Sequence, residues 1–403
     1  MMSKIDKLIK EKCPNGVEYK EVWELTSWDK KYNNVDKSMQ PKVLKYNYLL
    51  ANQLIEMVDD NGDILILETG INPTKKYTNA DLAGDNLCEG EIIAIPWGGT
   101  PNVKYYNGKF VTGDNRIAIS NDVNVLNTKF LYYLFNNNLD IISGFYRGSG
   151  IKHPEMKKIL TLKIPVPPIE VQEEIVKILD KFGELEAELE AELEARKSQY
   201  EFWRGKLLVK DNELIALGDL GKVCMCKRIM KNETSVEGDI PFYKIGTFGK
   251  EPDAYISKDL FEDYRNRFSY PKVGDVLISC SGTIGRAVIF DGHDSYYQDS
   301  NIVWIDNDES KVLNRFLFYV YQMSPWKVED GGTIKRLYTS NIVKTKIPLY
   351  SIEEQEKIIS ILDKFDKLVN DITIGLPAEI EARRKQYEYY RNKLLSFEEL
   401  INE

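Results

Sequence analysis

The chain has 403 residues, of which 43% are hydrophobic and 29% charged, a composition typical of a folded protein long enough for two domains. Its net charge of −9, five scattered cysteines and two histidines argue against a disulfide framework, a histidine-rich metal centre and histidine-based acid–base catalysis. No apolar run approaches the roughly 18 residues of a membrane helix, and the charged N-terminus has no apolar signal segment. We therefore expect no membrane association and a cytoplasmic location.

The first globular part is predicted to span residues 1–163 and to be mixed α/β. Short apolar runs at 63–67 and 91–95, bounded by Gly, Asp or Asn, are typical of strands. Aromatic and aliphatic residues recur every three or four positions at 130–136, which favours a short helix. A glycine turn at 98–100 follows a predicted strand, so its backbone can approach a ligand closely; a tight hairpin is an equal alternative.

Basic side chains of this part lie close in sequence to tyrosines. Positive charge beside aromatic rings is found on surfaces that bind the phosphates and bases of nucleic acids. The candidate contacts are Lys75, Lys76, Lys104, Arg147 and Lys152. Ordinary scatter of surface charge explains any single one of them equally well.

Residues 164–208 are predicted to form a long helix. From Ile175 to Leu207 apolar residues recur in steps of three and four while the other positions are charged, as in a coiled-coil seam. The unit Glu-Leu-Glu-Ala occurs three times between Glu184 and Ala195. Such a helix can pair with a second helix of the same chain, and a plain dimerisation coil is the alternative.

The second globular part, residues 209–346, shows the same order of elements. Strands are predicted at 275–279 and 301–305, a helix at 316–323, and a glycine turn at 281–285. Its candidate ligand contacts are Lys227, Arg228, Arg286, Lys335 and Arg336.

The helical part recurs at residues 347–395 and is followed by an acidic tail, residues 396–403. IPVPPIEVQEEIVKILDKF from Ile164 and IPLYSIEEQEKIISILDKF from Ile347 share twelve of nineteen residues. EARKSQYEFWRGKLL from Glu194 and EARRKQYEYYRNKLL from Glu381 share ten of fifteen. A capping box at Ser351 opens the second copy, and Gly375-Leu-Pro377 predicts a break within it.

The sequence shows no catalytic motif. It lacks the phosphate-binding loop, the dinucleotide-binding glycine pattern, and any credible set of nucleophile, base and acid. We therefore expect no catalytic residue, no metal and no cofactor in this chain.

These segments together resemble the specificity (S) subunits of type I restriction–modification systems. The resemblance rests on the two helical blocks and their copies, on GDVLISCSGTIGRAVIF from Gly274 with QDSNIV from Gln298, and on CPNGVEYKEV near the N-terminus. It implies an α+β fold in which two globular mixed α/β target-recognition domains are joined by two long helices in an antiparallel coiled coil, with an internal pseudo-twofold repeat. The turn Trp97–Thr100 departs from Ser281–Thr283 of the second copy, which limits transfer of residues between the halves.

The resemblance further implies that each domain reads one half of a bipartite site in double-stranded DNA, and that the coiled coil sets the spacer. It implies two modification (M) subunits as partners, which bind S-adenosylmethionine and methylate adenine, and restriction (R) subunits in the full complex. On this interpretation the ten candidate residues are DNA contacts. A non-catalytic two-domain scaffold that binds protein or small ligands is the alternative.

Overall fold

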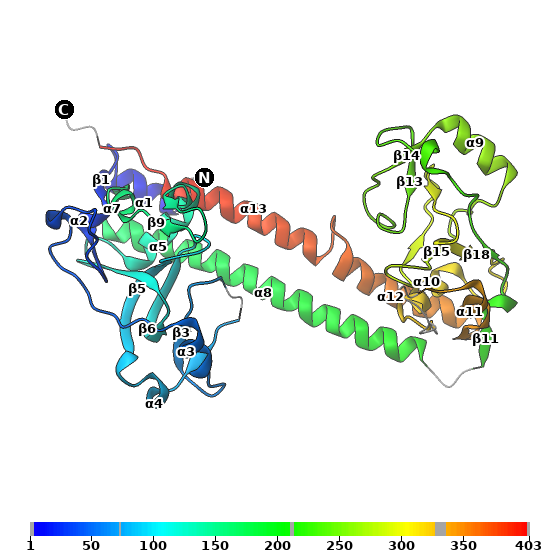
Figure 1. Cartoon of the computed structure of the whole chain (residues 1–403), viewed down its shortest axis with the longest axis horizontal. Helices are drawn as coiled ribbons and strands as arrows, with labels where there is room; N and C mark the ends of the chain where they lie inside the picture. The colour runs from blue at the N-terminus through cyan, green and yellow to red at the C-terminus, as the bar shows by residue number, and fades with distance from the viewer. Residues whose placement is uncertain (1–3, 72–73, 210–212, 327–335, 401–403) are drawn as a thin grey trace. The chain divides into compact units, whose positions relative to one another are not determined.

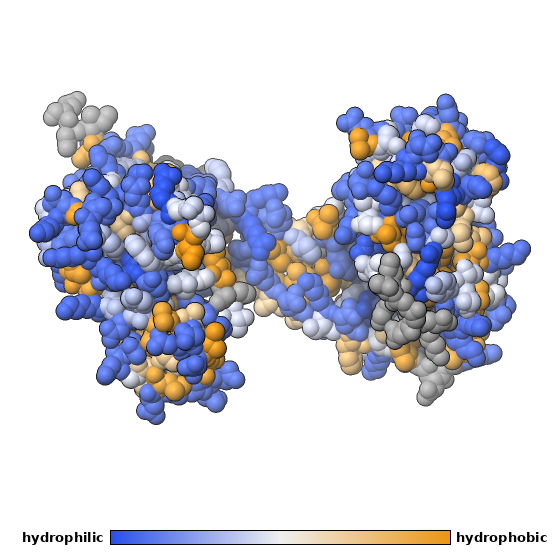
Figure 2. Space-filling view, viewed as in Figure 1, coloured by the Kyte–Doolittle hydropathy of each residue, from blue (hydrophilic) through white to orange (hydrophobic). Residues whose placement is uncertain are grey.

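The computed structural model describes residues 4–71, 74–209, 213–326 and 336–400. The chain forms two compact units (Figure 1): unit 1 contains Met1–Glu188 and Glu381–Glu403, and unit 2 contains Leu189–Ile380. Each unit joins a globular α/β part to segments of the long helices, which confirms the predicted fold class. Hydrophilic residues cover most of the visible surface of each unit (Figure 2). The predicted boundaries at 163, 208, 346 and 395 remain predictions.

Unit 1 is built on a six-stranded sheet in the order β2-β7-β5-β6-β3-β4, in which β3 and β6 are parallel and all other neighbours antiparallel. Its strands are β2 (Thr26–Trp28), β3 (Ile64–Leu67), β4 (Tyr77–Thr78), β5 (Cys88–Pro96), β6 (Lys104–Thr112) and β7 (Asn115–Ser120). The other elements of the globular part are α1 (Lys4–Lys12), β1 (Glu18–Glu21), α2 (Val22–Leu25), α3 (Ala51–Glu56), α4 (Ala80–Ala83), α5 (Thr128–Asn137), α6 (Leu139–Ser143), β8 (Tyr146–Arg147), β9 (His153–Pro154), α7 (Met156–Leu160) and β10 (Lys163–Val166). The predicted strands at 63–67 and 91–95 are β3 and β5, and the predicted helix at 130–136 is α5.

The core of unit 1 lies between the sheet and α5. Phe130 and Leu134 of α5 are buried together with Ile93 and Ile95 of β5. The side-chain oxygen of Asn127 accepts hydrogen bonds from two backbone N–H groups at the start of α5, which caps the helix. The other face of β5 packs with β3 and β6, so its residues are apolar on both sides.

In unit 2 two smaller sheets take the place of the six-stranded sheet of unit 1. A four-stranded antiparallel sheet has the order β12-β18-β15-β16, and a three-stranded sheet has the order β14-β13-β17. The elements are β11 (Leu214–Ala216), β12 (Val223–Cys224), β13 (Ile240–Tyr243), β14 (Tyr255–Ile256), α9 (Lys258–Arg267), β15 (Val276–Ser279), β16 (Ala287–Ile289), β17 (Tyr296–Tyr297), β18 (Ile302–Ile305), α10 (Asn314–Gln322), α11 (Thr339–Lys344) and β19 (Lys346–Pro348). The predicted strands at 275–279 and 301–305 and the predicted helix at 316–323 are confirmed.

The first helical part is one helix of 40 residues, α8 (Ile169–Leu208), which begins directly after Pro168. The second consists of α12 (Ile352–Asn370) and α13 (Leu376–Leu395), so the predicted break is confirmed. Ser351 and Glu354 form the predicted capping box at the start of α12. At the break, a Cβ on Gly375 would meet the Asp371 carbonyl oxygen at 2.6 Å. No helix in the described part of the chain is both long and apolar enough to cross a membrane.

Each unit pairs segments of the two helical parts. In unit 1 the ring of Phe182 stacks on Tyr390 at 5.6 Å, and the Glu186 carboxylate accepts a hydrogen bond from Arg384 at 2.6 Å. Since residue numbers rise along α8 as they fall along α13, the pairing is antiparallel. In unit 2 Tyr200 of α8 stacks on Phe365 of α12 at 6.3 Å. Each unit therefore combines the N-terminal block of one repeat with the C-terminal block of the other.

A buried glutamine fastens α8 to the globular part of unit 1. Gln172 is fully buried, and its side-chain oxygen accepts a hydrogen bond from the Asn127 backbone N–H at 2.9 Å. Its amide donates to the carbonyls of Val125 and Pro167 at 2.8 and 2.7 Å. Gln172 thus joins the loop before α5 to the loop before α8.

The same fastening recurs in unit 2. Gln355 of α12 is fully buried, accepts from the Leu313 backbone N–H at 2.8 Å, and donates to the carbonyls of Lys311 and Tyr350 at 2.8 and 2.9 Å. A second contact also recurs. Asp180 of α8 accepts hydrogen bonds from Tyr133 and Lys129 of α5, both at 2.6 Å. Asp363 of α12 accepts equivalent hydrogen bonds from Tyr319 of α10 at 2.5 Å and from Arg315 of the same helix at 2.7 Å. The internal repeat therefore extends to individual hydrogen bonds.

The chain beyond α13 packs into unit 1. The Val17 N–H donates to the Glu398 carbonyl at 2.9 Å, and the Leu400 N–H donates to the Val17 carbonyl at 2.8 Å. The Tyr19 hydroxyl donates to the Phe397 carbonyl at 2.9 Å. Residues 397–400 thus lie against the segment that precedes β1, an arrangement that the acidic composition of the tail did not indicate.

Candidate nucleic-acid interface

In unit 1 the glycine turn after β5 is held by a basic segment distant in sequence. The Gly99 N–H donates to the Lys152 carbonyl at 3.1 Å. The Trp97 carbonyl lies 2.7 Å from Nδ1 of His153. A Cβ on Gly98 would lie 2.9 Å from the Ile151 side chain, so a larger residue would displace that side chain. The turn and segment 151–153 therefore form one surface.

A buried ion pair supports this turn. The Arg116 guanidinium, 1% exposed, bonds the Asp29 carboxylate at 2.9 Å and also contacts Asp114. The Trp97 ring lies over the same guanidinium at 4.8 Å, and the His153 ring is 5.4 Å from Trp97. Because a guanidinium stacks well on an aromatic face, the buried Arg116 holds Trp97 in place at the start of the turn.

Two predicted contacts of unit 1 lie at this surface. Lys152 is exposed and belongs to the segment that holds the turn. Arg147 is opposite His153 in the β8–β9 pair, and its guanidinium lies 3.9 Å from the Glu155 carboxylate. Both can offer positive charge beside the exposed backbone of the turn.

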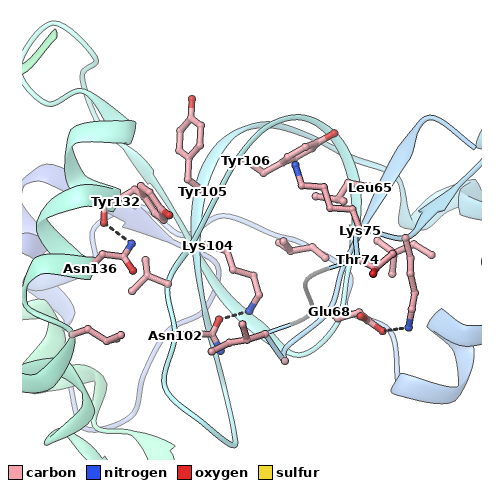
Figure 3. A pocket seen from close by; sticks show the side chains of 17 residues that line it. Leu65, Glu68, Thr74, Lys75, Asn102, Lys104, Tyr105, Tyr106, Tyr132 and Asn136 are labelled. Carbon is pink, nitrogen blue, oxygen red and sulfur yellow. Dashed lines mark hydrogen bonds and ion pairs between the residues drawn. The ribbon is translucent and has the colours of Figure 1, made fainter. Parts of the chain in front are cut away.

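The other three predicted contacts of unit 1 line a hollow beside β3 and β6 (Figure 3). Lys75 is exposed, whereas the Lys76 amine is paired with the Glu68 carboxylate at 2.9 Å. The Lys104 amine donates to the Thr69 carbonyl at 2.9 Å and to the Asn102 side chain. The structure therefore places the five candidates of unit 1 in two groups.

Unit 2 has an equivalent turn after β15. The Leu337 N–H donates to the Cys280 carbonyl at 2.8 Å, so a segment after the basic residues again holds the turn. The Ser281 hydroxyl donates to the Asn301 side chain at 2.9 Å. The predicted contact Arg336 donates to the carbonyl and the hydroxyl of Ser300, both at 3.0 Å.

Residues 298–301 organise this site, although the sequence had assigned them no role. The Asp299 carboxylate accepts from Arg228 at 2.9 Å, and the Gln298 side chain accepts from the Ile245 N–H at 3.1 Å. Ser300 has a φ of 52°, which is uncommon for a residue with a side chain. The only signal available was the motif QDSNIV itself, because a single sequence does not show which distant groups it contacts.

The remaining candidates of unit 2 are dispersed. Arg286 is half-buried, and its guanidinium donates to the Phe248 carbonyl at 2.8 Å. Lys227 lies over the Phe268 ring at 5.2 Å. Lys335 lies outside the described residues. The structure thus brings Arg228 and Arg336 together through residues 298–301.

The comparisons with known proteins agree with this organisation. The family model of the type I restriction modification DNA specificity domain matches residues 48–195 and 209–382. A Haemophilus influenzae protein assigned as a type I restriction enzyme specificity subunit is 51% identical over 325 residues, which cover 77% of this chain and 83% of that protein. The EcoR124I/EcoR124II specificity subunit of Escherichia coli is 33% identical over 306 residues, 70% and 74% of the two chains.

A solved structure shares the fold. The crystal structure of the type I restriction–modification S subunit from M. genitalium matches with a TM-score of 0.58 at 15% identity, over 94% of this chain and 96% of that one. The family match covers both globular parts, and the relatives above cover more than two thirds of the chain. This chain belongs to the family of type I restriction–modification specificity subunits.

Proposed function

We propose that each unit reads one half of a bipartite site in double-stranded DNA and that the chain catalyses no reaction itself. The supporting observation is the recurrence, in two units of different sequence, of a glycine turn held by a segment that carries basic residues. Cations beside such a turn suit DNA phosphates, and neighbouring side chains can reach base edges. Because the two globular parts differ in sequence, the two half-sites need not be the same.

The distribution of charge favours help from partner subunits. Residues 164–208 hold eleven acidic and six basic side chains, so much of the net charge of −9 lies in the first helical part. A chain whose net charge is negative repels the DNA backbone, so we expect it to bind DNA weakly alone. Modification subunits that bind S-adenosylmethionine and methylate adenine would supply the remaining affinity, and restriction subunits would join in a complex acting in the cytoplasm.

The helices offer two equivalent faces for two modification subunits. Phe202 and Trp203 of α8 are 62% and 38% exposed, and the residues at the same repeat positions of α13, Tyr389 and Tyr390, are 64% and 36% exposed. Exposed aromatic pairs are characteristic of interface anchors. Their recurrence supports one modification subunit on each face. Changing Phe202 and Trp203 to Ala should leave one modification subunit bound per chain, measured by mass photometry, whereas two bound subunits would contradict this assignment.

Reconstitution tests the function. The full chain, its cognate modification subunit, labelled S-adenosylmethionine and genomic DNA should together give adenine methylation that depends on sequence. Methyl transfer that needs the chain and saturates at a defined set of sites supports the proposal. Absence of a complex with the modification subunit would favour a scaffold that binds other proteins.

A further inference from the structure

The hollow in unit 1 has a volume of about 410 Å³ and lies between β3, β6, α5 and α6. Its lining combines three lysines, one glutamate, three tyrosines and several apolar side chains. Its charged lining is therefore positive overall. A hollow in unit 2, by contrast, is lined by Glu251, Asp291 and Asp294 with Lys250 and His293, which does not suit an anion.

Among the residues that the structure describes, no carboxylate is in direct contact with the Lys104 amine. Its amine donates to two neutral acceptors, the Thr69 carbonyl and the Asn102 side chain. The Glu68 carboxylate is instead bonded to Lys76 at 2.9 Å. Burial lowers the pKa of the Lys104 ammonium to about 8, and Glu68 opposes this change only in part. An anion arriving beside Lys104 would stabilise its charged form.

Asn102 connects the hollow to the glycine turn. Its amide donates to the Thr100 carbonyl at 3.0 Å and to the Thr69 carbonyl at 3.1 Å, while its oxygen accepts from Lys104. Figure 3 shows Lys104 turned toward Asn102 at the hollow. Lys75, exposed at the rim, adds a second cation. The hollow and the candidate DNA-reading turn of unit 1 are thus linked through a single side chain.

We infer that the hollow seats a backbone phosphate of the DNA half-site read by unit 1, held by Lys104 with Lys75 at the rim. This inference rests on the proposed DNA-reading function and names an anchoring contact within it. A phosphate seated beside Asn102 would set the register of the turn on the duplex without carrying sequence information. Lys104 therefore strengthens binding to every sequence alike.

The test uses the complex of the full chain with its modification subunits. Lys104→Met should weaken binding about tenfold at 0.1 M salt, for the specific site and for unrelated DNA alike. The slope of log affinity against log salt should become shallower by about 0.9, the value for one phosphate contact. Lys109→Met is the matched control, because Lys109 is exposed on the same strand and does not line the hollow. Lys104→Arg keeps the charge and should bind DNA as the unchanged chain does.

Acidity gives a second readout. Between pH 7 and 9 the affinity of the unchanged complex should fall more than that of Lys104→Arg, because arginine stays charged. Burial raises the pKa of the facing Tyr105, Tyr106 and Tyr132, so these rings stay neutral. Glu68, Lys75 and Lys76 are present in both proteins, so their contributions to the pH dependence of affinity cancel in the comparison.

Two outcomes would overturn the inference. In one, Lys104→Met and Lys109→Met bind DNA with the same affinity and the same salt dependence, while the unchanged complex still prefers its specific site. In the other, Lys104→Arg loses as much affinity as Lys104→Met. If the unchanged complex showed no preference among sequences, the proposed function itself would fail, which is a distinguishable result.

Discussion

Removing Glu188–Ala191, one Glu-Leu-Glu-Ala unit of α8, should shorten the preferred spacer by about one base pair and leave both half-site sequences unchanged. Four residues correspond to about 6 Å of helix and about 400° of rotation, so the apolar seam returns to within about 40° of its direction. A base pair occupies about 3.4 Å of duplex. With readers about one helical turn apart, roughly 10 base pairs centre to centre, and half-sites of about four, the present spacer should be near six.

The structure explains why this deletion should spare both units. The contacts of Phe182 and Glu186 lie within unit 1, those of Tyr200 lie within unit 2, and the deleted residues fall between them. The second helical part is interrupted at 371–375, between α12 and α13. It is therefore not an unbroken helix that would oppose a change in the length of α8. Methylation would be measured on DNA libraries with spacers of four to eight base pairs, and Glu188→Gln, which keeps the length, is the control. Unchanged methylation of the original spacer, with none of a shorter one, would show that the repeat count does not set the spacer.

Three other predictions test separate parts of the molecule. Exchanging residues 1–163 for the first domain of another family member should alter one half-site only; a simultaneous change in both, read from methylated motifs, would disprove independent reading. Arg286→Ala should relax one base position by about 1–3 kcal/mol if the side chain reads guanine, or weaken all sequences alike if it holds a phosphate; unchanged binding and methylation would remove it from the interface. Gln172→Ala should lower the free energy of unfolding by about 1–3 kcal/mol, because buried backbone groups lose their hydrogen-bond partners. Gln355→Ala should lower it by a similar amount. A denaturant titration that shows no loss of stability for either variant would contradict the role of these glutamines in joining helix to globular part.

Sequence patterns that span a few residues predicted the elements whose formation depends mainly on neighbouring residues. The seam of α8, the cap at Ser351 and the break before Pro377 each follow from residues a few positions apart, and each is present. Strands β14 and β17 have two residues each, too few for a periodic pattern to indicate them.

Long-range partners could not be predicted from one sequence. The repeat shows that the blocks at 194–208 and 381–395 are equivalent in sequence. It does not show in which unit each block packs. Leu394 and Leu395 are buried in the core of unit 1, whereas Leu208 is buried in that of unit 2. For the candidate site, residue type indicated the basic side chains but not their partners. Lys76, for example, is paired with Glu68, and this pairing depends on the fold of distant segments.

Mapping of methylated adenines in the genome of cells that express the full chain with its modification subunit is the most direct test of bipartite DNA reading. We expect one motif with two separate half-sites, a spacer near six base pairs, and a methylated adenine in each half on opposite strands. A continuous motif, or methylation that persists unchanged without this chain, would contradict it.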